Sequence, residues 1–252
     1  MNIFRKFKRF LIYSLRAKIN IDKNSVEDNL SLDRLFRHYN CDKGSSFIDD
    51  TRFIRGHDYG PFYEKHFFKL KHKNINILEL GVYGGASSAS FVKYFTNANN
   101  IYCLDINLTK LKYYSKKFKV FGLDISNRTM IDKFLIKNNI SKDQQFFDII
   151  VDDCSHRLSD QIKSFFFFFK LLKQNGIYVI EEFRFPNLYP HLNDCKDELK
   201  IDEILSSIQS KKIFKSKLVN EEVISEVIKN VKRINTYKGY RKDSDIAFIE
   251  KK

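Results

Sequence analysis

The stretch Ile149-Ile150-Val151-Asp152-Asp153-Cys154-Ser155-His156 decides the fold prediction for this chain. Its three apolar, β-branched residues are typical of a short buried strand. Two carboxylates, a serine and a histidine follow where that strand would end. Because ligands bind outside the carboxyl ends of strands in open α/β sheets, this cluster predicts a functional site. The alternative is an ordinary helix start, with Asp152 and Asp153 as caps and His156 as a solvated first-turn residue.

From Asn76 onward, short apolar runs alternate with amphipathic segments, which is the pattern of an α/β fold. We expect five parallel strands at 77–80, 101–104, 120–123, 149–151 and 177–180. Helices are expected at 86–94, 161–174, 197–213 and 220–231, with Asn175-Gly176 closing the second of them. The β-rich runs 233–237 and 246–249 predict a final hairpin with an antiparallel last strand. The predicted architecture is a Rossmann-like seven-stranded sheet, forming one catalytic unit over 71–252.

A glycine-rich turn, Gly81-Val82-Tyr83-Gly84-Gly85, follows the first of these strands. Glycines at a strand-to-helix turn let the backbone approach a ligand closely, and the next helix N-terminus favours negative charge. The turn departs from the GxGxxG of dinucleotide enzymes, so alone it indicates little. Asp105 ends the second strand, where an acid usually meets ribose hydroxyls. Asp124 ends the third strand and Glu181-Glu182 the fifth.

Residues 1–70 lack this alternation and are predicted to form an N-terminal helical segment and lid. Met1–Asn20 mixes basic and apolar residues, and its uncharged run is too short to span a bilayer. It predicts either an amphipathic helix on an anionic membrane or a helix packed on the domain. Ser31–Phe68 is rich in polar and aromatic groups, as in Asp42-Lys43-Gly44 and His57-Asp58-Tyr59. Such a segment is typical of a lid on the substrate side of a site, and a helical cap with ordinary surface polarity is the alternative.

Composition limits the partners of this chain of 252 residues, which is long enough for one α/β domain with additions. The formal charge of +14 favours an anionic membrane surface or a phosphorylated substrate. Lys and Arg are spread without any block of five, which disfavours nucleic acid. Four cysteines without CxxC spacing indicate reduced thiols in a cytoplasmic protein. The run Phe165 to Phe169 favours core packing over contact with a partner subunit in a homo-oligomer.

Together these motifs resemble the class I S-adenosylmethionine-dependent methyltransferases. More narrowly, four of them resemble the macrolide-sugar O-methyltransferases of the macrocin and mycinamicin type. These are Asp42-Lys43-Gly44, His57-Asp58-Tyr59, Asp152-Asp153-Cys154-Ser155-His156 and Ile180-Glu181-Glu182. The resemblance extends roughly over 42–249. Two departures bear on the metal site: Cys154 stands where that family usually has Gly, and Glu182 where it usually has Asp.

The resemblance implies metal-dependent transfer of a methyl group from S-adenosylmethionine to a sugar hydroxyl. It implies that Mg²⁺ is bound by Asp153, Glu181 and Glu182, and that His156 takes the hydroxyl proton as general base. Asp105 would contact the ribose and Asp124 the region of the adenine amino group. The full set of implied cofactor residues is Glu79, Gly81, Asp105, Asp124 and Asp152.

The acceptor is less well defined by these motifs. Because a basic protein favours phosphate, we expect a nucleotide-activated sugar for a bacterial surface polysaccharide. RNA, a lipid-linked glycan and a macrolide sugar are the alternative acceptors. A non-catalytic cofactor-binding or membrane-docking module is the alternative to an enzyme. We expect a cytoplasmic protein, with peripheral contact at the inner membrane face if Met1–Asn20 docks there.

Overall fold

The computed structural model describes residues 3–27 and 29–252, and the side chains from Phe7 onward within the first helix. The amphipathic character of the predicted helix can therefore be assessed from Phe7 onward. The contributions expected of Phe4, Arg5 and Lys6 lie outside the described side chains.

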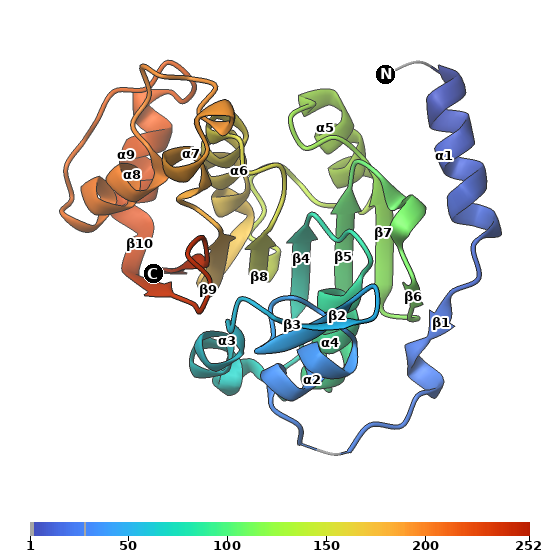
Figure 1. The fold of residues 1–252 in the computed structure, drawn as a ribbon. Helices are drawn as coiled ribbons and strands as arrows, with labels where there is room; N and C mark the ends of the chain where they lie inside the picture. The colour runs from blue at the N-terminus through green and yellow to red at the C-terminus, as the bar shows by residue number, and fades with distance from the viewer. Residues whose placement is uncertain (1–2, 28) are drawn as a thin grey trace.

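A seven-stranded sheet forms the centre of the molecule, in the order β10-β11-β9-β8-β4-β5-β7 (Figure 1). Its strands are β4 (Asn76–Leu80), β5 (Asn100–Asp105), β7 (Phe118–Gly122), β8 (Phe147–Asp152), β9 (Leu172–Glu181), β10 (Val231–Lys238) and β11 (Asp245–Lys251). Strands β4, β5, β7, β8 and β9 run parallel, whereas β11 pairs antiparallel with both β9 and β10. The predicted Rossmann-like sheet with an antiparallel last strand is confirmed.

The strand order reverses at β4, which lies between β5 and β8. Leu80 pairs with Leu104 on one side and with Asp152 on the other, so the carboxyl ends of these three strands are level. The glycine turn and the Asp153–His156 segment therefore leave the sheet side by side. Such a switch point is where open α/β sheets bind ligands.

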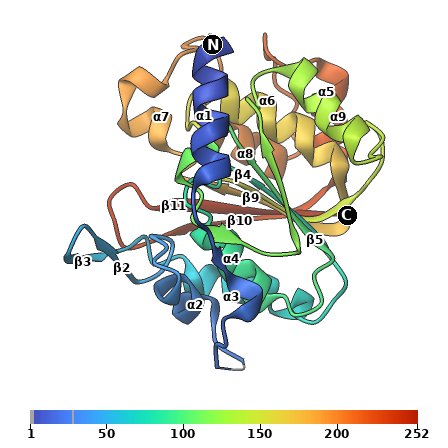
Figure 2. The ribbon, with the colours of Figure 1, turned by 90° about the vertical axis from the view of Figure 1, so that its right-hand side faces the viewer.

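Helices cover both faces of this sheet (Figures 1 and 2). Because strand side chains alternate, Ile149 and Val151 pack into one apolar core and Ile150 into the other. The first core includes α2 (Leu32–His38), α3 (Gly60–Phe67) and α4 (Ala86–Tyr94), and the second includes α5 (Arg128–Lys137), α6 (Leu158–Phe168), α8 (Ile201–Gln209) and α9 (Glu221–Asn230). The N-terminal segment thus contributes to one of the two cores, and the predicted domain boundary at residue 70 stays a prediction.

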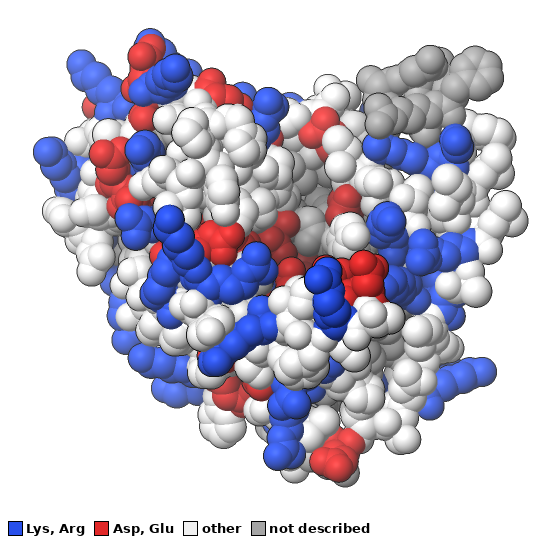
Figure 3. All heavy atoms as spheres, in the orientation of Figure 1, with Lys and Arg blue, Asp and Glu red and all other residues white. Residues whose placement is uncertain are grey.

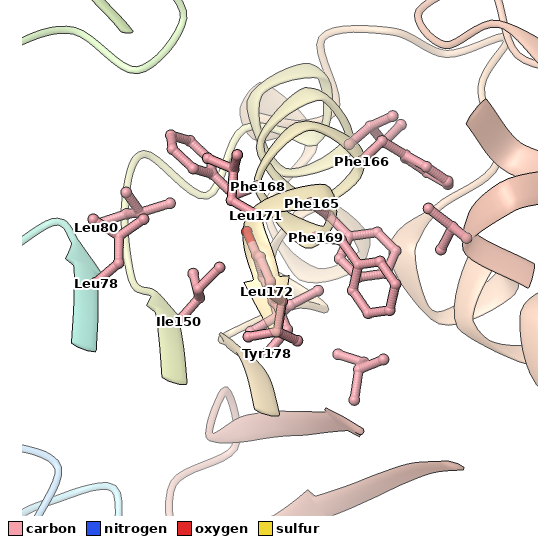
Figure 4. Close-up of a cluster of buried hydrophobic side chains, with 14 of the residues drawn as sticks. Leu78, Leu80, Ile150, Phe165, Phe166, Phe168, Phe169, Leu171, Leu172 and Tyr178 are labelled. Atoms are coloured by element: carbon pink, nitrogen blue, oxygen red, sulfur yellow. The ribbon is translucent and has the colours of Figure 1, made fainter. Parts of the chain in front are cut away.

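The phenylalanine run is largely core (Figure 4). Phe165, Phe166, Phe168 and Phe169 are each at most 2% exposed, which agrees with the packing interpretation. The predicted helix over 161–174 is wrong at its end, because α6 stops at Phe168, a 3₁₀ turn η4 (Phe169–Leu171) follows, and β9 begins at Leu172.

The Asn175-Gly176 pair consequently lies within β9 and does not close the helix. Leu172 pairs with Phe147, but Ile177 pairs with Ile149, so the residues between them bulge out of the ladder. Asn175 has a left-handed φ of +58°, a conformation that Asn tolerates well. The pair therefore shapes a bulge in the strand.

The N-terminal segment holds a β-hairpin that the sequence did not reveal. Strands β2 (Ser46–Asp49) and β3 (Arg52–Arg55) pair antiparallel and project from the body (Figure 2). The remaining elements are α1 (Ile3–Leu15), β1 (Ile19–Asn20), η1 (Ile21–Lys23), η2 (Phe68–Leu70), η3 (Leu108–Lys110), β6 (Tyr113–Tyr114), α7 (Phe185–Leu188) and η5 (Pro190–Leu192). Among the described residues, every helix is too short or too polar to cross a membrane.

Candidate active site

A cavity of about 1020 Å³ opens at the carboxyl edge of the sheet. Its walls come from the glycine turn, the ends of β5 and β7, the segment after β8, and the β2–β3 hairpin. Figure 3 shows this face of the molecule hollowed at its centre, with acidic side chains on the walls. The hairpin residues Phe47–Asp50 form part of the wall, and a lid role for this segment stays a prediction.

The glycine turn brings β4 and β8 into direct backbone contact at the floor of the cavity. Gly81 has φ +82°, and a Cβ there would lie 2.0 Å from the carbonyl oxygen of Asp153. Only glycine fits at this point. Tyr83, two residues later in the same turn, has a left-handed φ of +42°, a conformation that is strained for a tyrosine.

Asp105 lies against this turn and lines the cavity. One carboxylate oxygen accepts hydrogen bonds from the backbone N–H groups of Val82 at 3.0 Å and Tyr83 at 2.8 Å. The other accepts from the N–H of Asn107 at 2.7 Å. A carboxylate has about four lone-pair positions, so three bonds leave room for a hydroxyl. Asp105 therefore both shapes the turn and presents an acceptor to the cavity.

Asp124 also lines the cavity, at the end of β7. Its Oδ1 atom accepts from the backbone N–H of Ser126 at 3.0 Å and from the Ser126 hydroxyl at 2.7 Å. Both bonds use the same oxygen, so the second oxygen is oriented without being consumed by this turn. Asp124 thus lies on the cavity wall, and its predicted contact near the adenine amino group stays a prediction.

Glu79 and Asp152 lie inside their strands, outside the cavity lining. The Glu79 carboxylate accepts from the hydroxyls of Ser87 and Ser88 in the first turn of α4. It therefore supports the glycine turn from behind, and burial raises its pKa. Direct contact of Glu79 with a cofactor, as predicted, does not fit this placement.

The prediction that Asp152 binds the cofactor is corrected in the same way. Its carboxylate accepts from Tyr178 at 2.9 Å, Ser164 at 2.6 Å and the Cys154 thiol at 2.8 Å, and Asp152 itself is only 2% exposed. The helix-cap interpretation of this stretch is wrong as well. Helix α6 begins at Leu158, and no side chain caps it.

Asp153, His156 and Glu182 form the one group of three ligand-type side chains that the described residues place around a common point. Their ligand atoms all lie within 4.8 Å of one another. His156 Nε2 is 3.7 Å from Asp153 Oδ1 and 3.9 Å from Glu182 Oε2. His156 and Glu182 have left-handed φ values of +53° and +46°. Non-glycine residues held in this region are strained and cluster at functional sites.

Glu181, the third predicted metal ligand, contacts a lysine. Lys43 donates to Glu181 at 2.5 Å and also to Asp153, and Tyr63 donates to the other oxygen of Glu181. Lys43 is 2% exposed. Burial opposes its charge, but Asp153 and Glu181 raise the pKa of its ammonium well above the usual range. Burial raises the pKa of Glu181 to about 8, against the lowering effect of Lys43.

Lys43 had no predicted role, although its Asp42-Lys43-Gly44 motif was singled out. Nothing local marks this lysine as buried, because its partners lie 110 and 138 residues away in the chain. The sequence signal was the motif, and the pairing is tertiary.

Glu182 is held by the second quoted motif. Tyr59 donates to Glu182 at 2.9 Å, and His57 Nδ1 lies 3.2 Å from the same oxygen. Burial, together with Asp153 and Glu181, raises the pKa of Glu182 well above its usual range. Burial lowers the pKa of both His57 and His156, so both imidazoles are neutral near pH 7.

The charge balance of this cluster suits a divalent cation. Asp153, Glu181 and Glu182 bring three carboxyl groups, and the Lys43 ammonium contacts Asp153 and Glu181. Burial and the neighbouring acids disfavour the ionised form of Glu182, and a bound cation would offset that penalty. Carboxylate oxygens are ligands that Mg²⁺ prefers, whereas an imidazole is more typical of transition metals. The donor set fits Mg²⁺ through Asp153 and Glu182.

Comparisons with known proteins agree with the resemblance found in the sequence. No protein-family model matches the chain. The chain is 29% identical over 145 residues to the 8-demethyl-8-(2-methoxy-alpha-L-rhamnosyl)-tetracenomycin-C 3'-O-methyltransferase of Streptomyces olivaceus, covering 50% of this chain and 32% of the relative. It is 29% identical over 132 residues to the mycinamicin VI 2''-O-methyltransferase of Micromonospora griseorubida, covering 50% and 31%. The chain spans about a third of the length of these curated relatives.

A solved structure extends the likeness to most of the fold. The chain superposes with TM-score 0.64 on the MycE methyltransferase of the mycinamycin biosynthetic pathway, which was solved with Mg, SAH and mycinamycin VI. The two share 21% identity, over 89% of this chain and 55% of MycE. The chain thus has the fold of a class I methyltransferase, and the resemblance to the mycinamicin type is confirmed at that level.

Proposed function

We propose that this chain is a metal-dependent O-methyltransferase that transfers the methyl group of S-adenosylmethionine to a sugar hydroxyl. The observation that carries the proposal is the grouping of His156 with Asp153 and Glu182 beside the cavity that starts at the glycine turn. The names of the relatives, which describe O-methyltransferases of mycinamicin VI and of a rhamnosyl tetracenomycin, support the reaction class.

The cofactor would lie in the cavity between the glycine turn and the end of β7. Gly81 lets the turn pack against the Asp153 backbone at the edge of this cavity, Asp105 would accept a ribose hydroxyl, and Asp124 would face the adenine. Glu79 would act from behind, by fixing the serines of α4. Asp152 has no part in cofactor binding in this proposal.

For the metal, we assign Asp153 and Glu182 as ligands and His156 as their neighbour at the acceptor side. Glu181 would serve mainly as the partner of Lys43, which is a revision of the predicted three-carboxylate set. When bound, S-adenosylmethionine supplies an electrophilic methyl group, and Mg²⁺ lowers the pKa of a coordinated hydroxyl.

His156 would hold the proton that the acceptor hydroxyl releases. The lowered pKa keeps its imidazole free to accept a proton near pH 7, and Asp153 at 3.7 Å stabilises the imidazolium that forms. His57 is less suitable as a base, since its Nδ1 contacts the Ser244 hydroxyl at 2.8 Å and Arg241 lies 3.3 Å from its Nε2. The adjacent guanidinium opposes protonation of His57.

The identity of the acceptor is a separate part of the proposal. The predicted nucleotide-activated sugar of a bacterial surface polysaccharide rests on the net charge of +14. The cavity itself is lined by seven aspartates against three Lys or Arg residues. Such a wall suits a cationic sulfonium and neutral hydroxyls better than phosphate, so uncharged glycosides belong in the same test.

The test is methyl transfer from labelled S-adenosylmethionine to a panel of nucleotide sugars, a lipid-linked saccharide, a macrolide glycoside and RNA, with Mg²⁺ and with EDTA. We expect transfer to a sugar that EDTA abolishes and that Asp153→Asn reduces in parallel. Full activity in EDTA would end the metal assignment. Tight binding of S-adenosylhomocysteine without transfer to any acceptor would favour the non-catalytic module.

A further inference from the structure

Helix α1 lies along the outer side of the molecule, against η3 (Figures 1 and 2). The described side chains that turn toward the body are Arg9, Tyr13 and Arg16, which are half-buried. Arg9 Nη1 donates to the carbonyl of Ile106 at 3.2 Å, and Arg16 Nη1 donates to that of Thr109 at 2.8 Å. The helix is therefore attached to the domain mainly through its polar face.

Its apolar stripe points the other way. Phe7, Phe10, Leu11 and Leu15 are 60%, 62%, 41% and 82% exposed. Their spacing of three and four residues places them on neighbouring turns of one side. A helix that only packs on its own domain turns such a stripe toward the core. The reverse orientation leaves an apolar surface available for a partner.

The charge of this segment identifies the kind of partner. Residues 1–21 contain six Lys and Arg residues and no Asp or Glu, although the whole chain has 31 acids. The exposed residues Lys110 and Lys112 add further positive charge beneath the helix. An apolar stripe bordered by basic residues alone is the signature of a helix that lies in the interface of an anionic bilayer.

We propose that α1 docks the protein on an anionic lipid bilayer, with Phe7, Phe10, Leu11 and Leu15 inserted at the headgroup level. This attachment does not depend on the methyltransferase activity. The position of the helix links the two, because Ile106, which accepts from Arg9, lines the active-site cavity. Docking would hold the rim of the cavity next to the membrane. If the proposed function holds, this location of the cavity favours a lipid-linked sugar over a freely diffusing acceptor.

The test is co-sedimentation of the full chain with vesicles of phosphatidylcholine alone and of phosphatidylcholine with phosphatidylglycerol. We expect at least about tenfold stronger binding to the anionic vesicles, weakened by raised salt. Phe7→Ser/Leu11→Ser should reduce that binding about tenfold or more without changing affinity for S-adenosylhomocysteine. Ile136→Ser is the matched control, because Ile136 on α5 is 72% exposed far along the chain from α1.

Equal binding to both vesicle types, or wild-type binding to neither, would overturn the proposal. So would a double variant that binds like the control. Analytical ultracentrifugation tests the alternative that the stripe binds a second copy of the chain. A wild-type dimer that Phe7→Ser/Leu11→Ser converts to a monomer would make the stripe an interface between two copies. Vesicle binding needs no acceptor or metal, so its outcome is independent of whether methyl transfer is detected.

Discussion

Replacing Lys43 by Met removes the ammonium that lies between Asp153 and Glu181. The methionine is similar in length and apolar, so the change deletes charge with little change of volume. The three carboxylates of the cluster would then face one another without a cationic neighbour among the described residues. We expect a large loss of stability, which Mg²⁺ partly restores.

The magnitude follows from burial on both sides of the pair. Lys43 and Glu181 have side chains only 3% and 2% exposed, and Asp153 24%. Removing one partner of a buried ion pair costs about 3–5 kcal/mol, which corresponds to a fall in Tm of roughly 6–20 °C for a chain of this size. Mg²⁺ at about 100 times its Kd would return roughly 2.7 kcal/mol through binding to the folded state.

The pH dependence of unfolding provides a second check on the stability loss expected for Lys43→Met. The pKa of Glu181 is about 8 even with Lys43 present, and it should rise further without it. A carboxyl with a raised folded-state pKa stabilises the fold below its unfolded pKa and loses that contribution as pH rises through the folded value. Wild type and variant lose this contribution alike up to about pH 8, so the stability deficit of Lys43→Met should grow as pH rises from about 8 to 10.

The assay is thermal unfolding of wild type and variant across this pH range, in EDTA and in Mg²⁺. Lys71→Met is the matched control, because Lys71 is also buried but lies over the Tyr94 ring, 4.9 Å from its centroid, instead of against a carboxylate. A Tm for Lys43→Met equal to that of the control, with no greater response to Mg²⁺ than wild type, would refute the reasoning.

Three further predictions concern single groups. His156→Ala should lower kcat roughly 10²–10⁴-fold while leaving S-adenosylhomocysteine affinity unchanged, as measured by initial rates and isothermal titration. Asp105→Ala should weaken that affinity by about 1–3 kcal/mol, because it unpairs the N–H groups of Val82 and Tyr83; unchanged binding in a folded variant would remove Asp105 from the site. Burial lowers the pKa of His66 to about 4, so the unfolded chain takes up its proton first and stability should fall as pH drops from about 6.5 to 4. His66→Gln should flatten this fall by about 1–2 kcal/mol, a figure reduced for partial exposure, and unfolding curves that stay parallel would contradict it.

The sheet was predictable because its strands carry a local signal. Buried parallel strands are nearly all apolar, so runs such as Ile77-Leu78 and Ile149-Ile150-Val151 are evident without any tertiary information. The end of α6 was not, because Asn175-Gly176 is equally typical of a helix end and of a bulge. The ladder with β8, which selects the bulge, is a contact between distant segments.

The same distinction explains the site residues. Side chains alternate along a strand, so Asp152 must share the face of Ile150, which packs into a core; Asp153, one residue later, leaves the strand and reaches the cavity. This periodicity was present in the sequence and could have excluded Asp152 from the cofactor set. No comparable signal existed for Lys43, whose burial depends wholly on how 1–70 folds over the sheet edge.

The consecutive acids Glu181 and Glu182 pose the opposite geometrical problem. In a regular strand, two neighbouring side chains point to opposite faces, so they cannot serve one cluster. Here β9 ends at Glu181, and Glu182 turns into the left-handed region at φ +46°. Holding a non-glycine residue there costs about 1–3 kcal/mol. With this backbone conformation, Lys43 donates to Glu181 at 2.5 Å, and Glu182 lies 3.9 Å from His156. Glu182 is thus on the side where the acceptor would bind. One acid therefore balances the buried lysine and the other would remain available to the proposed metal, a division that a straight strand would not permit.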